Sequence, residues 1–483
     1  MPKRNLIWVL AILAGTVALV WVTHLPSPPG ESQNSELRPV ADTYDLIRKE
    51  YLYPVDREEL LRGAAKGMAG ALDEHSSYIP PGKQAAFAQR LMGMERGLGL
   101  RIRQADGQVI VVGPLVGSPA HQVGIVSGDL LAEIDAKPAA ALSLDEVRAL
   151  LDGEVGTQVH LTIIRDGWRK NFVVTREEFP VESVTGLYRD RAGAWVASVG
   201  REGFAYVRVR EFVRDTSEQI QRMLRPMDRL RGLVLDLRGN PGGLLGSAVA
   251  AADLFLDDGL IVRVARRNGP SERYEAQAEG TFPPVPMVVL IDTRTASAAE
   301  IVAGALRVHD RAVLVGTRTC GKGCVQSMFP LSGDLGQLNL TTSEFYLDGS
   351  QPIARRPGSD RWGVDPHEQV ILLPSALEVL AALRDQAEVL PSSRQPTTAP
   401  SSDKATEPVS LPARILEADS QLARAVELLA QPAEMEILLR SAAAERAAER
   451  ARTGEAGKAD EAKKAIVRTK PMSKPATQKS TPN

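Results

Sequence analysis

Two short motifs carry side chains that could perform covalent chemistry. The motif T-A-S-A-A-E-I at 295–301 places Ser297 where an apolar run ends and a helix is expected to begin. Amides in the first turn of a helix lack an intrahelical partner, so the amide of Ala298 could begin an oxyanion hole beside the serine hydroxyl. The motif G-K-G-C-V-Q at 321–326 carries Lys322. A neutral lysine can accept the proton of a serine hydroxyl, and Ser–Lys is a known variant of the Ser-His-Asp triad.

The same residues also fit roles without chemistry. Serine is among the commonest residues that cap a helix, and Ser297 stands at such a position. Lys322 lies between two glycines and is equally well explained as a solvated lysine in a turn. His309 is a further candidate base, supported only by its proximity in sequence. These motifs alone therefore do not decide between catalysis and structure.

Composition excludes several classes of protein. Of the 483 residues, 43% are hydrophobic and 24% charged, so the chain is globular and too long for a single hydrophobic core. It has 58 Lys and Arg against 60 Asp and Glu, and this balance makes nucleic acid a poor partner. Two cysteines exclude a disulfide scaffold, and the 6 histidines include no pair with the spacing of a zinc helix. We expect no metal and no cofactor.

The N-terminus predicts a membrane anchor. Residues 6–22 are apolar and uncharged, and they follow Lys3 and Arg4. As a helix at 1.5 Å per residue they would span about 25 Å, close to a bilayer core of about 30 Å. No small-residue cleavage motif follows, which favours an uncleaved signal anchor over a cleaved signal peptide. The positive charges before the run predict a single-pass protein of the inner membrane, with the remaining chain in the periplasm.

The segment before residue 180 predicts a compact β-rich module. Its strand-like stretches are 109–113, 130–135, 159–164 and 172–175. A helix is expected at 143–151, where a serine and a glutamate three residues later have the spacing of a capping box.

Strands and helices alternate from 180 to about 380, which is an α/β pattern. Near-continuous apolar runs at 230–237, 285–292 and 312–316 predict strands that are buried on both faces. The serine motif would begin a helix at 297–306.

We therefore expect a multidomain α/β protein with eight segments in order. They are a signal anchor at 1–25, a linker at 26–36, a helical region at 37–95, the β-rich module at 96–179, the α/β core at 180–388, a linker at 389–410, a helical segment at 411–440 and a disordered basic tail at 441–483. Within the helical segment, residues 411–430 read as one amphipathic helix.

Four further motifs complete a family pattern. They are A-G-A-L-D-E-H-S-S-Y-I-P-P at 69–81, G-L-G-L-R-I at 97–102, G-S-P-A-H-Q-V-G-I-V-S-G-D-L-L-A-E-I-D at 117–135 and L-D-L-R-G-N-P-G-G-L at 235–244. With the serine and lysine motifs in the same order, the chain resembles the carboxyl-terminal processing peptidases, also called tail-specific proteases, over about residues 37–430. The resemblance implies a PDZ domain placed before a crotonase-like α/β peptidase core, and hence a serine endopeptidase.

The resemblance also implies a role for each candidate residue. Ser297 matches the family's nucleophile, and Lys322, 25 residues later, matches its general base. Gln326 matches the glutamine that orients the lysine, and period-2 spacing would put the two on one face of a strand. Gly242 and Gly243 match the loop that supplies a second oxyanion amide, beside the amide of the residue after the serine.

The PDZ domain of this family reads peptide C-termini. Its carboxylate loop matches Gly97, Leu98, Gly99 and Leu100, so the expected substrates are proteins or peptides of the cell envelope with a free C-terminus. Asp152 stands where many relatives have an arginine, which in some of them helps couple peptide binding to activation. The sequence therefore leaves open whether the domain activates or inhibits. The alternatives are a catalytically inactive PDZ scaffold of the envelope and an acyl-CoA enzyme with a related core. The sequence does not distinguish a monomer from a homo-oligomer.

Cys320 and Cys324 flank Lys322 and are the only cysteines of the chain. In an extended segment their Cα atoms would lie about 13 Å apart, beyond the roughly 7 Å that a disulfide allows. A tight turn at Gly321–Gly323 would close the gap but would draw the lysine away from Gln326. We expect both cysteines to stay thiols, and the alternative is a redox switch in which oxidation silences the lysine.

Overall fold

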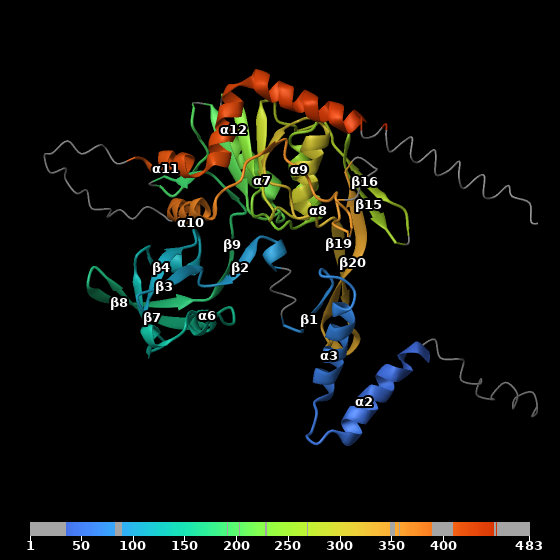
Figure 1. Ribbon diagram of the computed structural model, residues 1–483. Helices are drawn as coiled ribbons and strands as arrows, with labels where there is room; N and C mark the ends of the chain where they lie inside the picture. The colour runs from blue at the N-terminus through green and yellow to red at the C-terminus, as the bar shows by residue number, and fades with distance from the viewer. Residues whose placement is uncertain are drawn as a thin grey trace, which may run out of the picture. The chain divides into compact units, whose positions relative to one another are not determined.

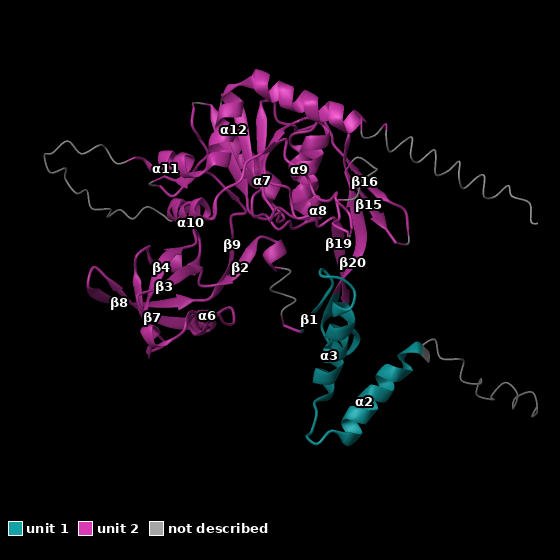
Figure 2. Ribbon diagram, in the orientation of Figure 1, with its two compact units in different colours: residues 1–80, 330–338 teal, residues 81–329, 339–483 magenta. Residues whose placement is uncertain are grey.

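The computed structural model divides the chain into two compact units, residues 1–80 with 330–338 and residues 81–329 with 339–483 (Figure 2). The residues that it describes are 35–82, 89–190, 192–201, 203–227, 229–267, 269–347, 353–356, 358–388, 409–448 and 451. The predicted anchor at 6–22, most of the predicted linker at 389–410 and the tail beyond residue 451 lie outside them. No helix within these ranges combines the length and the apolar character that a membrane span requires.

The first unit is mainly helical. Its elements are η1 (Ser35–Leu37), α2 (Arg38–Glu50), α3 (Arg57–Gly70), β1 (Ser77–Ile79) and η3 (Ser332–Asp334). Asp56 caps α3, because its carboxylate accepts a 2.9 Å hydrogen bond from the amide of Glu59. The hydroxyl of Tyr78 donates to the carbonyl of Leu335 at 2.6 Å, which ties the 330–338 segment to β1.

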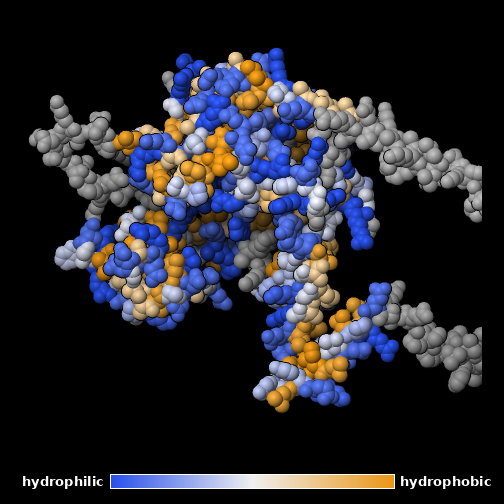
Figure 3. Space-filling model, in the orientation of Figure 1, coloured by the Kyte–Doolittle hydropathy of each residue, from blue (hydrophilic) through white to orange (hydrophobic). Residues whose placement is uncertain are grey.

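Apolar side chains gather on the surface of this unit, around α2 and α3 (Figure 3). None of the residues of α2 is buried. Leu46, Leu52, Met68 and Leu72 are each more than half exposed. The described part of the unit therefore leaves apolar surface in contact with solvent.

The β-rich module has a sheet with the strand order β3-β4-β5-β7-β8, and β6 pairs with β5 (Figure 1). Its elements are β3 (Leu100–Ala105), β4 (Gln108–Pro114), α5 (Pro119–Gln122), β5 (Leu130–Ile134), β6 (Lys137–Pro138), η2 (Ala139–Ala141), α6 (Leu144–Leu151), β7 (Gln158–Arg165) and β8 (Trp168–Thr175). The predicted strands and helix are confirmed. The capping box is also confirmed, since the Ser143 amide donates to the Glu146 carboxylate at 2.8 Å and the Glu146 amide donates to the Ser143 hydroxyl at 3.3 Å. β3 is an edge strand, and β2 (Met94–Gly97) pairs with β9 (Glu177–Pro180) where the chain enters and leaves the module.

The core is built on a sheet that, in the described residues, has six strands in the order β10-β13-β14-β17-β18-β21. These strands are β10 (Val184–Thr185), β13 (Phe204–Val209), β14 (Gly232–Asp236), β17 (Met287–Ile291), β18 (Val313–Gly316) and β21 (Glu368–Gln369). All neighbours are parallel except β10 with β13. Every residue of β14, β17 and β18 is buried, which confirms the three predicted apolar strands.

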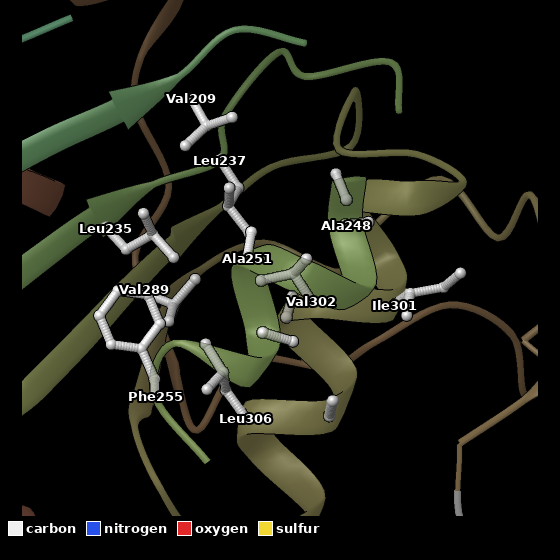
Figure 4. Close-up of a cluster of buried hydrophobic side chains, with 14 of the residues drawn as sticks. Val209, Leu235, Leu237, Ala248, Ala251, Phe255, Val289, Ile301, Val302 and Leu306 are labelled. Carbon is white, nitrogen blue, oxygen red and sulfur yellow. The ribbon is translucent and has the colours of Figure 1, made fainter. Parts of the chain in front are cut away.

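Helices cover both faces of this sheet, because the side chains of each strand alternate between two hydrophobic clusters. Leu235 and Val289 pack on one face against α8 and α9 (Figure 4). Val234 and Leu290 pack on the other face against α10 and α12. The helices are α7 (Thr216–Leu224), α8 (Leu245–Asp253), α9 (Ala298–Val308), α10 (Pro374–Glu388), α11 (Leu411–Ala418) and α12 (Ser420–Ala430), with a further helix at 432–448.

A second sheet carries the residues that follow the lysine motif. Apart from β1, which was described with the first unit, the strands of this sheet are β15 (Leu260–Arg266), β16 (Glu272–Glu275), β19 (Cys324–Pro330) and β20 (Gln337–Tyr346). β15 and β19 both pair with β20, and β16 pairs with β15. A separate short pair, β11 (Tyr188–Arg189) with β12 (Trp195–Val196), precedes β13.

Residues 411–430 form two helices and not the single helix predicted from their periodicity. Asp419 separates them with φ −107° and ψ 85°, and its carboxylate caps α12 by accepting from the Leu422 amide at 3.1 Å. Arg238, which follows β14, donates to both carboxylate oxygens of Asp419 at 2.8 Å and also to Asp236. All three charged side chains are buried. This network fixes the start of α12 at the end of a central strand.

The network generates a stability prediction. Asp419→Asn should lower the free energy of unfolding by about 3 kcal/mol, because it leaves the buried Arg238 with one carboxylate less. Glu436→Gln, which breaks an exposed pair with Arg440 on the following helix, should cost less than about 0.5 kcal/mol. Urea unfolding near neutral pH measures both, and equal losses would contradict the prediction.

The same network gives a pH dependence. Burial alone would raise the pKa of the Asp236 carboxyl, but the charge and hydrogen bonds of Arg238 hold it well below its ordinary value of 3.8. A carboxyl whose pKa is lower in the folded state contributes stability above its ordinary pKa and loses it as the pH falls. The contribution of Asp236 is therefore complete near neutral pH.

Candidate active site

Three loops follow neighbouring parallel strands and meet at one edge of the core sheet. The loop 237–243 follows β14, the loop 292–297 follows β17, and the loop 317–323 follows β18. Parallel strands end at the same edge, so their loops lie side by side. The Cys320 amide donates to the Thr295 carbonyl at 3.0 Å and joins the last two loops directly. The fold therefore brings the serine and lysine motifs together.

Ser297 occupies the sharp turn between β17 and α9. Its backbone has φ 56° and ψ −119°, a region that residues other than glycine rarely adopt and that costs about 1–3 kcal/mol. A strained turn from a strand to a helix is the geometry that displays the serine of a nucleophile elbow. The surrounding structure must hold Ser297 in this conformation.

The buried carboxylate of Glu300 connects the two motifs. Its Oε2 accepts hydrogen bonds from the amides of Ser297 at 2.8 Å and Lys322 at 2.9 Å. Its Oε1 accepts from the amide of Gly321 at 2.7 Å and from the hydroxyl of Thr319 at 2.6 Å. Because one oxygen binds both amides, the nitrogens of Ser297 and Lys322 lie within about 6 Å of each other. Burial raises the pKa of the Glu300 carboxyl, and these four hydrogen bonds oppose the rise.

Gly242 lies directly against the serine. A Cβ at this position would stand 2.8 Å from the Cβ of Ser297 and 3.0 Å from the nitrogen of Ala298, and the φ of 110° also favours glycine. The Gly242 amide donates to Oδ1 of Asn240 at 2.8 Å. The amides of Gly243 and Ala298 have no hydrogen-bond partner among the described residues. Of the three amides expected at an oxyanion hole, these two remain available.

The spacing had predicted that Lys322 lies on a strand. The structure instead places it in the loop before β19. β19 begins at Cys324, so Cys324 and Gln326 share a strand face and the lysine precedes it. The side-chain nitrogen of Gln326, Nε2, lies 3.0 Å from Sγ of Cys324 and 3.3 Å from Oγ1 of Thr341. Lys322 is half-buried. Within the described chain, its amine makes no direct hydrogen bond to the Ser297 hydroxyl. In enzymes such a contact often closes only when substrate binds.

His309 is too distant to act as the base. It follows the C-terminus of α9, whose 11 residues span about 16 Å, and Ser297 precedes the N-terminus. Its Nε2 lies 2.9 Å from the carbonyl oxygen of Leu260. Cys320 and Cys324 are both thiols, the first exposed and the second buried, in agreement with the prediction.

Two residues of the site were not predicted. Glu300 had a usable signal, because it is the only charge in the apolar stretch 298–306 and stands three residues after Ser297, the spacing of a capping box. Asn240 had no such signal, since a buried asparagine in a turn cannot be told from an exposed one. Its side-chain nitrogen donates to the carbonyl of Val209 at 2.9 Å, so Asn240 fixes the turn that carries Gly242.

The predicted carboxylate loop connects β2 to the edge strand β3. Gly97 ends β2 and Leu100 begins β3, so the loop proper is Leu98 and Gly99. The Leu98 side chain is buried in the core of the module, and only its backbone can touch a peptide. The carbonyls of Leu98 and Gly99 accept hydrogen bonds of 2.9 and 2.8 Å from amides within the module. Their own amides have no partner in the described part of the chain, which leaves two donors for a ligand.

Comparison with protein families gives three matches along the chain. Peptidase family S41 matches residues 203–370, and the PDZ domain matches residues 110–165. The family described as the activating protease CtpB N-terminal domain matches residues 24–80.

The chain is also similar to curated and solved proteins. The carboxy-terminal-processing protease of Bartonella bacilliformis is 32% identical over 362 residues, which cover 73% of this chain and 80% of that protein. The carboxy-terminal processing protease CtpA of Bacillus subtilis is 30% identical over 331 residues, which cover 67% of this chain and 68% of that protein. The solved photosystem II D1 C-terminal processing protease has 27% identity and a TM-score of 0.41, covering 73% of this chain and 92% of that one.

The arrangement around Glu300 generates a prediction. Glu300→Gln should lower the free energy of unfolding by about 2 kcal/mol, because an amide nitrogen would replace one oxygen and leave two buried donors without an acceptor. Glu146→Gln is the matched control, since it alters an exposed capping box of the same spacing, where a cap contributes about 1 kcal/mol. Urea unfolding followed by circular dichroism measures both variants. A loss for Glu300→Gln no larger than the control's would contradict the role given to the buried carboxylate.

Proposed function

The chain belongs to the carboxy-terminal processing proteases of peptidase family S41, and on this premise we propose that it cleaves peptide bonds with Ser297 as the nucleophile and Lys322 as the general base. It is a serine-type peptidase with a PDZ domain. The observation that carries the proposal is the Glu300 carboxylate, one oxygen of which binds both the Ser297 and the Lys322 amide. The mainly parallel core sheet with helices on both faces also supports the crotonase-like fold that the resemblance implied.

The proposed reaction proceeds through an acyl-enzyme. The neutral amine of Lys322 accepts the proton of Ser297 Oγ while the oxygen attacks the carbonyl carbon of the scissile bond. The amides of Ala298 and Gly243 stabilise the oxyanion that forms. The protonated lysine then gives its proton to the leaving nitrogen, and the C-terminal product departs. Water attacks the acyl-enzyme with Lys322 again as the base, which releases the N-terminal product and restores the serine.

Gln326 is proposed as a positioning residue for the lysine. Its side-chain nitrogen donates hydrogen bonds to Cys324 Sγ and Thr341 Oγ1. This fixes the side chain by its nitrogen and leaves its oxygen to accept a hydrogen bond from the Lys322 amine. An amine held in this way needs less reorientation when substrate arrives.

Recognition of substrate C-termini is proposed for the PDZ domain. The unpartnered amides of Leu98 and Gly99 are suited to hold a terminal carboxylate, and the unpaired edge of β3 can take the preceding residues as an added strand. Asp152, at the end of α6, accepts a 2.9 Å hydrogen bond from the adjacent Gly153 amide, and its negative charge does not favour an arginine-based switch at this position.

We further propose that the enzyme acts on proteins of the cell envelope while anchored in the inner membrane by residues 6–22, with its peptidase core in the periplasm. The uncharged apolar run and the two positive charges before it support this orientation. Proteinase added to spheroplasts should digest the core. If the orientation were reversed, the core would be protected from the proteinase.

The Ser–Lys assignment generates a prediction about activity. Ser297→Ala and Lys322→Ala should each reduce cleavage of an unfolded protein by roughly 1000-fold or more without changing the circular dichroism spectrum, because members of a catalytic unit fail together. Lys322→Arg should be equally inactive, since arginine stays protonated and cannot accept a proton. Ser217→Ala on α7 and Lys170→Ala on β8 serve as controls.

Cleavage near the wild-type rate by any of the three active-site variants would refute the assignment. Absence of cleavage by the wild-type protein would favour the inactive PDZ scaffold instead.

The carboxylate loop generates a prediction about binding. A peptide with an apolar last residue and a free C-terminus should bind about tenfold more tightly than its C-terminally amidated form, because amidation removes the charge that the loop amides hold. Calorimetry on the full-length Ser297→Ala protein measures both affinities without cleavage. Acetylation of the peptide N-terminus is the control and should change little. Equal affinity for the acid and the amide would refute recognition of the C-terminus.

A further inference from the structure

A cleft of about 1400 Å³ extends from the carboxylate loop of the PDZ domain to the core. Its lining includes Gly97–Leu100 and also Pro241, which lies in the turn that carries Gly242. Among the described residues that line it, ten are arginines and six are acidic. The wall of the cleft is therefore positively charged overall.

The excess charge centres on Arg101, Arg208 and Arg210, here called the arginine cluster. The carboxylate of Glu388, the last residue of α10, pairs with Arg101 and with Arg210, the latter at 3.2 Å. The Nε of Arg208 is buried and has no hydrogen-bond partner in the described chain. Burial would raise the pKa of the Glu388 carboxyl, but the neighbouring arginine charges hold it below its ordinary value. One carboxylate thus forms the direct ion pairs of a cluster that carries three positive charges.

The adjacent charges do not neutralise this cluster. Arg238 and Arg384 pair with Asp236 and Asp419 in the buried network described above, where two cations meet two anions. That network is balanced by itself and has no carboxylate to spare. Glu388 is the carboxylate that pairs directly with the cluster, and Glu95 acts on Arg210 at longer range, so the three arginines still outnumber the carboxylates and a further anion would bring the charges closer to balance.

The position of the cluster relates it to the peptide groove. Arg101 follows the carboxylate loop immediately and stands on the edge strand β3. The side chains of Leu100 and Ile102 pack against the core of the PDZ domain, whereas Arg101 reaches Glu388 on α10. A peptide strand added to β3 would turn alternate side chains to the same side as Arg101. An acidic side chain there would meet the arginine cluster.

We propose that the arginine cluster is a subsite for an acidic side chain in the substrate tail, a few residues before the C-terminus, and that Glu388 holds this place when no substrate is bound. The proposal rests on the proposed reading of C-termini by the PDZ domain. It adds a specificity for glutamate or aspartate that the carboxylate loop alone does not provide. Because the groups are partly exposed, the preference weakens at high salt.

Three fluorescent peptides with the same apolar last residue test the proposal on the full-length Ser297→Ala protein. One carries glutamates at the three preceding positions, the second carries glutamines there, and the third is the glutamate peptide with an amidated C-terminus. At low salt the glutamate peptide should bind at least about fivefold more tightly than the glutamine peptide. This ratio should fall towards one at high salt. Fluorescence anisotropy measures all affinities.

Substitutions locate the preference. Arg208→Gln with Arg210→Gln should bring the glutamate-to-glutamine ratio close to one, whereas Arg169→Gln, an arginine paired with Glu133 outside the cleft, should leave it unchanged. Glu388→Gln should raise the affinity for the glutamate peptide by about twofold or more. This last variant gains affinity, so it keeps the test decisive if the double variant fails to fold.

The outcomes separate this proposal from the one on which it rests. Equal binding of the glutamate and glutamine peptides, with the amide still weaker, would overturn the acidic subsite and leave recognition of C-termini intact. A glutamate preference that survives in the folded double variant would also overturn it. Equal binding of the amidated and free glutamate peptides would instead count against the PDZ proposal.

Discussion

The buried carboxylate of Glu300 is the constraint on which the arrangement of the site depends. An ionised group removed from water is stable only when hydrogen bonds replace those of the solvent. Here the replacements come from the serine turn and from the loop that carries the lysine, and each of the two oxygens serves two donors. Neither loop can shift without leaving part of the carboxylate unsatisfied. The same bonds hold Ser297 at its positive φ, so the strain of the serine backbone is supported by the partner that fixes the lysine loop.

The core sheet makes this arrangement possible because its central strands are parallel. β14, β17 and β18 end at one edge, and each delivers one loop of the site there. Their side chains are committed to two hydrophobic clusters, so the register of the strands, and with it the position of the loops, is fixed by packing on both faces. Close approach then limits the choice of residue. Gly242 stands so near to Ser297 that any side chain would displace the serine.

The sequence predicted features that depend on a local, repeating pattern. It did not predict features that depend on one contact between residues far apart in the chain. Apolar runs predicted the central strands, and the spacing of Ser143 and Glu146 predicted a capping box, because periodicity and caps are local properties. The break at Asp419 was missed, since it depends on Arg238, far away in the chain. The place of Lys322 before β19 was missed for the same reason, because it follows from hydrogen bonds to Glu300 that spacing does not reveal. The roles of Gly242 and Gly243 could be separated only when the structure showed which amide Asn240 engages.

The pairing of Arg238 with Asp419 has a consequence for the order in which the protein can be built. Residues 411–430 supply much of the cover for one face of the sheet, and Asp419 completes the buried network at the end of β14. During synthesis this segment emerges well after every strand of the sheet. In a nascent chain, one face of the core sheet is therefore only partly covered, and the buried Arg238 lacks one of its two carboxylates. The strand β14, which leads into the turn 237–243, is secured only at that later stage. Completion of the core, and with it the support of the strand that leads to Gly242, therefore waits for a segment that is made after every strand of the sheet.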